Sequence, residues 1–282
     1  RCKSGKDSKT LQAAFDIYYP HLAKQFRDPA QPKRMIEKDI LPTLGSRYLD
    51  DVCRADFTAL FQKVVARGAP VMANRLLIQT KRFLSYCEQQ GWLEENPLLR
   101  VTQQAIGGKE KARERALDWD EIAALITFVF DTTNKLHAGT RWAILGDLLT
   151  GQRASEVLGM ADKGLPWLEG PAKTAPYKVP MTPLVRLWVK NKPSQVTSRH
   201  STVARVFIEH DWGFTPHDLR RTFASRLSDL GVMPHVIEKM LNHKMEGVMA
   251  VYNRAEFWPE RVAAQKVWDK KLLSLIKKNP GA

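Results

Sequence analysis

The chain has 282 residues, enough for one large domain or two modest ones, and its 44% hydrophobic and 26% charged residues suit a soluble protein with an adequate core. No apolar run is long enough to span a membrane, no signal peptide is visible, and three widely spaced cysteines favour a reducing cytoplasm over a disulfide framework or a zinc site. The net charge of +14 indicates a polyanionic partner, most often nucleic acid, but it does not separate a binder from an enzyme.

Residues 1–99 have the pattern of a small helical domain of four or five helices. Apolar residues recur at helical spacing over 8–26, and the segment 28–34 is expected to break that helix before another begins. Asp56 is expected to cap a helix that ends at Gly68, and a longer helix stops near Gly91.

Residues 100–116 show no hydrophobic period and contain a Gly-Gly pair, which is typical of a solvated linker between domains. The same segment is strongly basic and is also expected to cross a nucleic-acid backbone as a strap. Its basic residues are Arg100, Lys109, Lys111, Arg113 and Arg115.

Residues 117–282 combine helices with one short β hairpin. Asp118 is a plausible cap of the first helix, Gly151 closes the second, and a Gly- and Pro-rich stretch then holds two short strands around a turn. Thr182 caps a further helix, and the rest is helical to Lys278. The predicted fold class is therefore mainly α with a small β-sheet (α+β), in two domains.

The stretch TPHDLRRTFASRL, residues 215–227, predicts a helix with Thr215 as its cap and Asp218 at its positively polarised start. Helical geometry places Arg220 at the border of a buried stripe, beside His217, and Arg221 nearly opposite, in solvent. A half-buried arginine needs a partner, which is a carboxylate in an ion pair or a phosphate held by both guanidinium nitrogens. The stripe consists of Leu219, Phe223, Leu227 and Leu230.

Three further segments carry similar residue types. GQRASEVLG places Arg153 and Glu156 three apart on one helix face, either as a simple ion pair or as an arginine oriented for an anion. LNHK holds His243 in a helix-ending turn, and Tyr252 follows nine residues later in VYNRAEF. Each alone is more often structural than functional.

Taken together, these segments resemble the tyrosine recombinases, or phage integrases. TGQRASEVLGM, KTAPYKVPMTP, TPHDLRRTFASRL, MLNHK and VYNRAEF follow that family's order and approximate spacing over the whole chain. The resemblance implies a helical core-type DNA-binding domain over 1–99, a basic linker over 100–116 and a catalytic domain over 117–282. It is strongest to integrases of prophages and genomic islands, some of which carry a further amino-terminal arm-binding domain; we expect such a segment upstream of Arg1.

The resemblance also implies a role for each matching residue. Tyr252 is the nucleophile, and Arg153 and Arg220 hold the scissile phosphate, with Glu156 supporting Arg153. His217 and His243 assist with protons and hydrogen bonds, and Lys173 protonates the leaving 5′ oxygen, with Lys178 as its competitor. Asn242 stands where a glycine is common, a change that its tolerance of positive φ allows. The expected DNA contacts are Arg221, Lys109, Lys111, Arg113 and Arg115.

Metal-free strand cleavage needs these groups. Two permanently charged arginines neutralise the phosphate oxygens, and tyrosine forms a 3′-phosphotyrosine that conserves bond energy, so that no metal, cofactor or ATP is implied. The implied partners are double-stranded attachment sites, a homotetramer on DNA, and accessory bending and directionality proteins. The implied location is the cytoplasm, for a bacterial or phage-encoded protein associated with the nucleoid. The carboxy-terminal segment 261–278 packs on its own domain or docks on a neighbouring subunit.

Three other functions remain open. A regulator that lost catalysis would keep the fold, although the presence of Arg153, Arg220, His217, His243 and Tyr252 together argues against it. A type IB topoisomerase would relax plasmid that lacks any specific site. A chromosome-dimer resolvase would share the chemistry and differ in its biological role.

Overall fold

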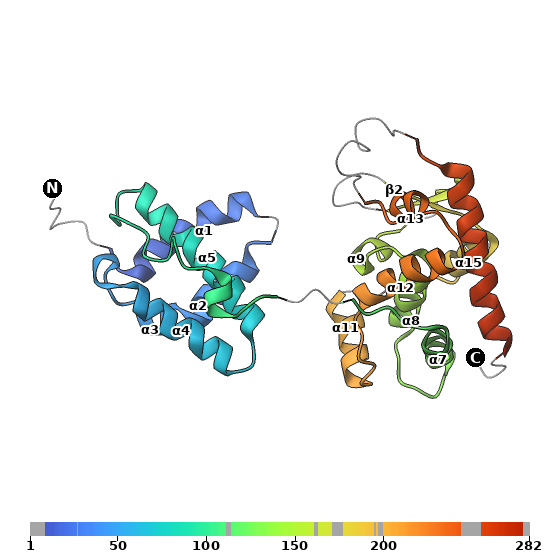
Figure 1. Ribbon diagram of the computed structural model, residues 1–282, viewed down its shortest axis with the longest axis horizontal. Coiled ribbons are helices and arrows are strands. Elements are labelled where there is room, and N and C mark those ends of the chain that lie inside the picture. Colours follow the sequence, from blue (N-terminus) through green and yellow to red (C-terminus); the bar gives the residue numbers. More distant parts are fainter. Residues whose placement is uncertain are drawn as a thin grey trace. The chain divides into compact units, whose positions relative to one another are not determined.

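The computed structural model describes residues 9–26, 28–110, 114–160, 163–170, 177–194, 196, 200–243 and 255–278. The chain folds into two compact units, Arg1–Ala112 and Arg113–Ala282, called unit 1 and unit 2 (Figure 1). In the described residues, helices dominate and one two-stranded sheet is present, which confirms the predicted fold class. None of the described helices is long and apolar enough to cross a membrane.

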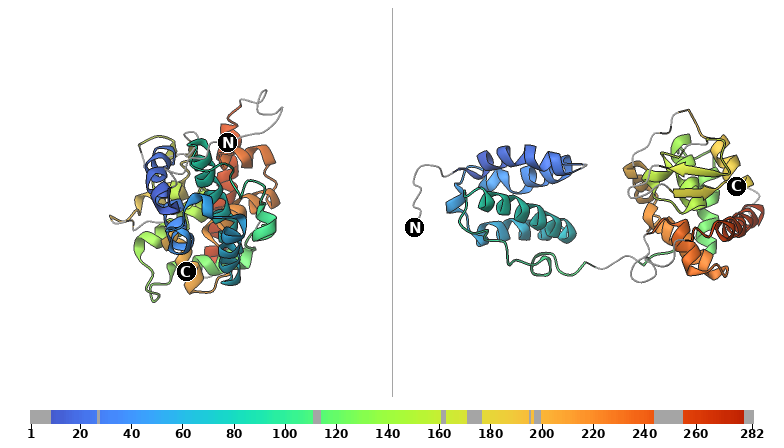
Figure 2. Two further views of the ribbon diagram at one scale, coloured as in Figure 1. Left: turned by 90° about the vertical axis from the view of Figure 1, so that its left-hand side faces the viewer. Right: turned by 90° about the horizontal axis from the view of Figure 1, so that it is seen from above.

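Unit 1 is helical around a core that includes Phe15, Phe57, Phe61 and Phe83. Its long helices α1 and α5 lie side by side (Figure 2). The elements are α1 (Leu11–Gln25), α2 (Ala30–Asp39), α3 (Leu41–Leu44), the 3₁₀ turn η1 (Leu49–Asp51), α4 (Arg54–Ala66), α5 (Pro70–Gln89) and α6 (Gln103–Ile106).

Of two local expectations in unit 1, one was confirmed in part and one was wrong. The chain does break between two helices, since α1 ends at Gln25 and α2 begins at Ala30, but the break is shorter than the segment 28–34, because α2 accommodates Pro32 in its first turn, where a missing N–H costs nothing. Asp56 does not precede α4 as its cap. It lies in the first turn, and its carboxylate accepts a hydrogen bond from the backbone N–H of Cys53 at 2.8 Å.

The first half of the expected linker belongs to unit 1. The buried side chain of Asn74 in α5 accepts a hydrogen bond from the N–H of Gly107 at 2.9 Å and donates to the carbonyl oxygen of Gly108 at 3.2 Å. Gly107 is required here, because a Cβ would lie 2.2 Å from the carbonyl oxygen of Pro70. Residues 101–108 are therefore a folded edge of unit 1 rather than a solvated connection.

Unit 2 surrounds a larger core with helices and carries the hairpin at its surface. The right-hand view of Figure 2 shows the two strands beside one another. They are antiparallel, and Glu169 is paired with Lys178. The elements are α7 (Trp119–Phe130), α8 (Ala138–Thr150), α9 (Ala154–Val157), β1 (Trp167–Gly170), β2 (Tyr177–Pro180), α10 (Pro183–Lys190), α11 (His200–Glu209), α12 (Pro216–Asp229), α13 (Pro234–Met240) and α15 (Trp258–Lys278).

Helix α15 packs along its own unit (Figure 1). Trp268 is fully buried and donates from its indole to the carbonyl oxygen of Leu148 at the end of α8, 3.1 Å away. Gln265 donates to the carbonyl oxygen of Leu149 at 3.0 Å. Val267 and Leu273 are each 41% exposed, so one apolar edge of this helix stays in solvent while the opposite face is fixed to α8.

Candidate functional site

The start of α12 is built by a reciprocal capping box. The buried carboxylate of Asp218 accepts hydrogen bonds from the backbone N–H and the hydroxyl of Thr215, at 2.9 and 2.8 Å. Pro216 occupies the first helical position, where its fixed φ suits the helix. This arrangement fixes the direction of the first two turns, which carry His217, Arg220 and Arg221.

Arg220 is more deeply buried than its predicted position at the border of the stripe. Its side chain is 3% exposed and crosses to two other segments of unit 2. One nitrogen, Nη1, donates to the carbonyl oxygen of Gly151 at 3.0 Å, and Nη2 donates to that of Leu241. The guanidinium thus joins the end of α8 to the end of α13 by backbone contacts, and it brings a permanent positive charge to their junction.

Arg221 does not stand free in solvent as predicted. Its Nη1 forms an ion pair with Asp218 Oδ1 at 2.6 Å, and its side chain is 33% exposed. The same Asp218 therefore caps α12 and holds Arg221. Burial raises the pKa of Asp218, but the hydrogen bonds from Thr215 and the contact with Arg221 outweigh burial, and the pKa lies below its ordinary value.

Arg153 lies where α8 turns into α9. Its Nη1 pairs with Glu156 Oε1 at 2.8 Å, while the other carboxylate oxygen accepts from the backbone N–H of Arg153 at 3.2 Å. Glu156 is almost wholly buried and Arg153 is 39% exposed, so the carboxylate holds a guanidinium that still faces solvent. The structure shows the ion pair between these two residues, and its role in orienting Arg153 for an anion stays a prediction.

Gln152 is a contributor that the sequence reasoning missed. It is buried, and its amide donates to the carbonyl oxygens of Thr150 at 3.1 Å and Met240 at 2.7 Å. It therefore ties the loop before Arg153 to α13, in parallel with the contacts of Arg220. The only signal for Gln152 in the sequence was its position directly before Arg153. Its residue type does not reveal a contact with Met240, which is far away in sequence.

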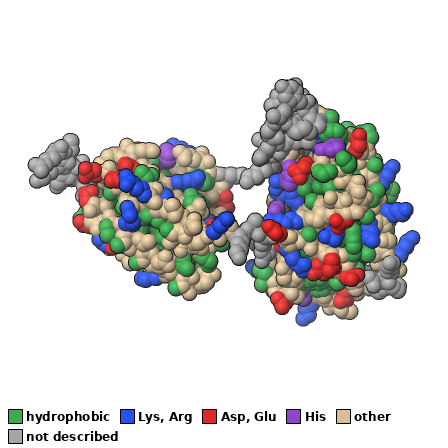
Figure 3. Space-filling model, viewed as in Figure 1, with side chains coloured by type: hydrophobic (Ala, Val, Ile, Leu, Met, Phe, Trp, Pro, Cys, Tyr) green, Lys and Arg blue, Asp and Glu red, His purple; other side chains and the backbone are tan. Residues whose placement is uncertain are grey.

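His217, Arg153, Glu156, Arg220 and Arg221 form what we call the arginine–histidine cluster. Partial burial lowers the pKa of His217, and the positive charges of Arg221, Arg220 and Arg153 lower it further, against the opposing effect of Asp218. The hydrogen bond from Arg220 to the carbonyl oxygen of Gly151, two residues before Arg153, brings the start of α12 to the turn between α8 and α9. Figure 3 shows histidine side chains beside lysine and arginine side chains on this face of unit 2.

His243 follows the end of α13. Its Nδ1 lies 2.7 Å from Glu238 Oε2, and its side chain is 38% exposed. It stands two residues after Leu241, whose carbonyl oxygen accepts from Arg220, so the chain itself places it near the cluster. The preceding Asn242 has φ of +53°, the conformation expected where a glycine is common.

Lys178 extends from β2 over the ring of Trp167 in β1, with its Nζ 4.3 Å from the ring centroid. Trp167 in turn meets the ring of Trp258, in the first turn of α15, edge to face at 5.7 Å. Lys173 lies outside the described residues, so the choice between the two lysines stays a prediction.

Of the remaining expected site residues, some lie outside the described residues and others lie within them. Tyr252, Lys111 and Arg113 also lie outside the described residues. Lys109 is exposed. Arg115 forms a bidentate ion pair with Glu121 in the first turn of α7, so part of its charge is already compensated.

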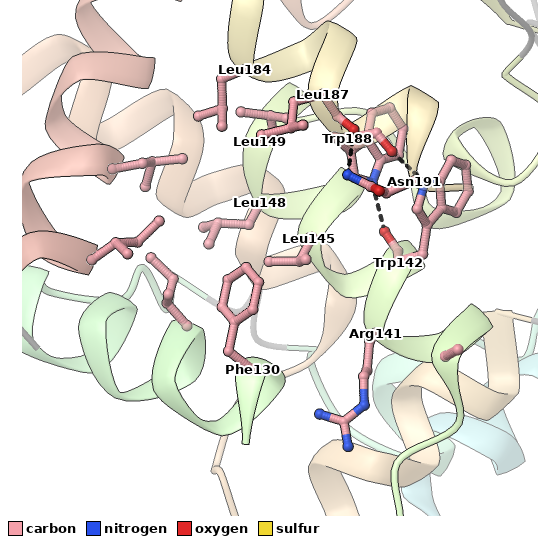
Figure 4. Close-up of a pocket in the computed structure, with 14 residues that line it drawn as sticks. Phe130, Arg141, Trp142, Leu145, Leu148, Leu149, Leu184, Leu187, Trp188 and Asn191 are labelled. Carbon is pink, nitrogen blue, oxygen red and sulfur yellow. Dashed lines mark hydrogen bonds between the residues drawn. The ribbon is translucent and has the colours of Figure 1, made fainter. Parts of the chain in front are cut away.

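The described part of unit 2 also contains an apolar cavity of about 320 Å³ among α7, α8, α10 and α15 (Figure 4). Its polar groups are already engaged: the Trp142 and Trp188 indoles each donate to the other's backbone carbonyl oxygen at 2.9 Å. The guanidinium of Arg141 points away from the cavity and binds backbone carbonyl oxygens, including that of Leu136. This cavity shares no residue with the cluster.

The cluster can bind an anion through two guanidinium groups held at fixed positions, while a neutral imidazole beside them can exchange a proton or a hydrogen bond. Among the described residues, no group of three or more histidine, cysteine or carboxylate side chains could hold a metal ion.

Two family models match segments of this chain. The model of the phage integrase central domain matches residues 24–104, and that of the phage integrase family matches residues 184–257. The chain is 21% identical to tyrosine recombinase XerC of Alcanivorax borkumensis, over 89% of this chain and 92% of the relative. It is 24% identical to prophage integrase IntZ of Escherichia coli, over 88% of this chain and 67% of the relative.

The fold is similar to that of lambda integrase, in a structure of its tetramer bound to a Holliday junction. The TM-score is 0.69 at 17% identity, over 86% of this chain and 79% of that chain. The two matched domain models lie in the two units and keep the order of core-binding and catalytic domains. The chain therefore belongs to the phage integrase family, the tyrosine recombinases.

Proposed function

We propose that this tyrosine recombinase is an integrase that cuts and rejoins DNA at specific attachment sites, and so inserts or excises a prophage or genomic island. The observation that carries the proposal is the arginine–histidine cluster, in which Arg220 and Arg153 are fixed by Gly151, Leu241 and Glu156 before any substrate arrives. Such preorganised charge stabilises a phosphate transition state without reorganisation.

In this reaction Tyr252 attacks the scissile phosphorus, the bond to the 5′ oxygen breaks, and a 3′-phosphotyrosine forms. Arg153 and Arg220 neutralise the non-bridging oxygens, and His217, neutral because its pKa is lowered, accepts or shares a proton near them. Lys173 or Lys178 gives a proton to the departing oxygen, and His243 adds a hydrogen bond to the phosphate. A 5′ hydroxyl of a partner strand then reverses the attack.

The clamp on DNA would come from both units. Unit 1 is the proposed core-type DNA-binding domain, and Lys109, Lys111, Arg113 and Arg115 are the proposed backbone contacts of the connection. Recombination between two duplexes requires four active sites, which the lambda integrase tetramer on a Holliday junction exemplifies for that relative. We therefore propose a homotetramer on double-stranded DNA, with accessory bending and directionality proteins, in the bacterial cytoplasm.

A strand-exchange assay tests the proposal. Two duplexes, one from the junction of the mobile element and one from the vacant chromosomal site, are incubated with the protein in EDTA and without ATP. Recombinant junctions are expected with the wild type and none with Tyr252→Phe. Relaxation of a plasmid that lacks both sites, without exchange, would instead identify a topoisomerase, and exchange confined to chromosomal dimer sites would identify a resolvase.

A further inference from the structure

Arg261 is a buried arginine that the proposed chemistry does not use. It lies in the first turn of α15, and its side chain is about 4% exposed. Its Nη2 donates to the backbone carbonyl oxygen of Lys178 in β2, and its Nη1 lies 3.4 Å from Glu256 Oε2. The guanidinium also lies 5.0 Å from the centre of the Trp258 ring.

Simple packing does not explain an arginine at this position. Burial lowers the pKa of Arg261 against the raising effect of Glu256, which is itself 70% exposed. The buried Nε has no acceptor in the part of the chain that the structure describes. Replacing such an incompletely paired buried charge with an apolar residue is often neutral or stabilising. What an apolar side chain cannot do is donate a hydrogen bond from α15 to the hairpin.

The two segments joined by Arg261 are adjacent in sequence to proposed catalytic groups. Arg261 follows Tyr252 by nine residues, and its acceptor Lys178 follows Lys173 by five. Two further contacts join the same segments: the edge-to-face pair of Trp167 and Trp258, and a hydrogen bond from the hydroxyl of Thr182, just after β2, to the buried Asp269 of α15. Arg261 adds a hydrogen bond from a charged group to β2, close to the start of α15.

We propose that Arg261 is a positioning residue that fixes the β1–β2 hairpin to the start of α15, and thereby aligns the hairpin lysine with the leaving oxygen during strand cleavage. The inference rests on the proposed function, because it assigns Arg261 to that same reaction. Glu256 also contacts Lys239 of α13, at 3.7 Å, so the link extends toward the segment that carries His243.

The leaving group provides a specific test. In the ordinary reaction, the Tyr252 oxygen bonds to phosphorus, the P–O5′ bond breaks, and the electron pair left on the 5′ oxygen takes a proton from the lysine. When sulfur replaces that bridging oxygen, the P–S bond breaks and a stable thiolate leaves without a proton. A misplaced lysine therefore slows cleavage of the oxygen substrate and leaves cleavage of the sulfur substrate nearly unchanged.

The experiment measures single-turnover adduct formation by the full chain on nicked duplexes that span the element junction, with either bridging atom. Arg261→Met keeps much of the apolar volume and removes the donors, and Arg261→Lys keeps a charge and one donor group. We expect Arg261→Met to lower the cleavage rate of the oxygen substrate by about 10- to 100-fold. This is less than the full rate enhancement of about 10²–10⁴-fold that proton transfer typically gives. On the sulfur substrate we expect a change below about threefold, with Arg261→Lys partly restored.

Arg226 provides a matched control. Within the described ranges, it too has a buried Nε without an acceptor, an exposed ion-pair partner in Asp229, and an aromatic neighbour in Trp119, at 5.9 Å. Its contacts with Asp229 of α12 and Trp119 of α7 lie away from the hairpin, so Arg226→Met is expected to leave both cleavage rates unchanged.

Equal loss on both substrates, or no loss on the oxygen substrate, would overturn the positioning role of Arg261. If Arg261→Met does not fold by circular dichroism, the ratio of the two rates for Arg261→Lys decides in its place. Absence of a Tyr252-dependent adduct in the wild type on either substrate would refute the proposed function itself, and the inference with it.

Discussion

At the scale of single residues, the cluster depends on charges that lower the affinity of His217 for a proton. Burial has the largest effect on the pKa of His217, and among the nearby charges Arg221 has the largest effect. Because the folded-state pKa lies below the unfolded value of about 6.5, the contribution of His217 to stability is present above that pH and is lost as the pH falls through the folded value. A neutral imidazole at physiological pH follows.

Arg221→Ala is expected to raise the pKa of His217 toward its ordinary value, because a nearby positive charge is removed. The measurement is an NMR titration of the imidazole protons, with Arg221→Lys as the control that keeps the charge. The acidic limb of the cleavage rate should move to higher pH in the alanine variant. An imidazole pKa that is the same in both variants would contradict this electrostatic account.

Asp147 of α8 is the other residue with a distinct electrostatic prediction. Its carboxyl is buried, neither oxygen has a hydrogen-bond partner among the described residues, and burial raises its pKa well above the ordinary value. The folded chain therefore holds a proton that the unfolded chain releases above pH about 3.9. Stability falls as the pH rises from there to the folded pKa, by at most about 1.4 kcal/mol per pH unit.

Asp147→Asn removes this titration while keeping the shape of the side chain. Urea unfolding between pH 5 and 8 should show a smaller loss of stability with rising pH than in the wild type. The exposed Asp120→Asn serves as the control and should keep the wild-type slope. A wild-type slope in Asp147→Asn would show that Asp147 is not the titrating group.

Sequence reasoning reached some of these residues and not others. The Arg153–Glu156 pair and the pairing of Asp218 with Thr215 follow from spacing within one helix turn, which is a local property. The acceptors of Arg220 are 69 and 21 residues away in sequence, so no local pattern predicts them. Arg221 was misplaced because a helical projection shows its direction but not the attraction of Asp218 three residues earlier.

At the scale of elements, the turn from α8 to α9 decides where Arg153 lies. Gly151 has φ of +63°, and a Cβ there would lie 2.4 Å from the buried ring of Phe223 in α12. The glycine therefore allows both the left-handed turn and the close approach of α12, the helix that carries Arg220.

Gly151→Ala is expected to cost roughly 2–4 kcal/mol, about 1 for the positive φ and about 1–3 for overpacking against Phe223. Gly231→Ala is the matched control, because Gly231 has φ of +83° with open space around its Cβ position, and about 1 kcal/mol is expected. Urea unfolding of both variants measures the difference. Similar losses would show that the contact with Phe223 does not matter.

The caps explain why most element boundaries in unit 2 were predictable. Asp118, Thr182 and Thr215 each bond to the first turn of the helix they precede, and Gly151 ends α8 in the left-handed conformation. Each signal acts within four residues. The start of α2 was missed because Pro32 was interpreted as a break, although proline is compatible with a first turn.

At the scale of the whole molecule, the charge of +14 is the main electrostatic property. If the proposed clamp neutralises about six phosphates, the logarithm of the binding constant should fall with the logarithm of the salt concentration at a slope near −5. Binding to attachment-site duplex between 50 and 200 mM salt measures it. A flat response would contradict a clamp based on phosphate contacts.

The connection between the units refines that prediction. Lys109 is exposed, whereas Arg115 is already paired with Glu121. Lys109→Ala should therefore reduce the salt slope more than Arg115→Ala. The sequence identified both as basic, but it could not show which charge was compensated, because that depends on how Arg115 approaches the first turn of α7.

The measurement that tests the central claim most directly is covalent trapping. Wild type and Tyr252→Phe are incubated in EDTA with labelled, nicked duplexes that span the element junction, and denaturing gels are followed by mapping of the DNA-linked peptide. We predict an adduct in the wild type only, attached at Tyr252 through a 3′ phosphate. An adduct of equal yield in Tyr252→Phe, or none in the wild type, would contradict the proposed mechanism.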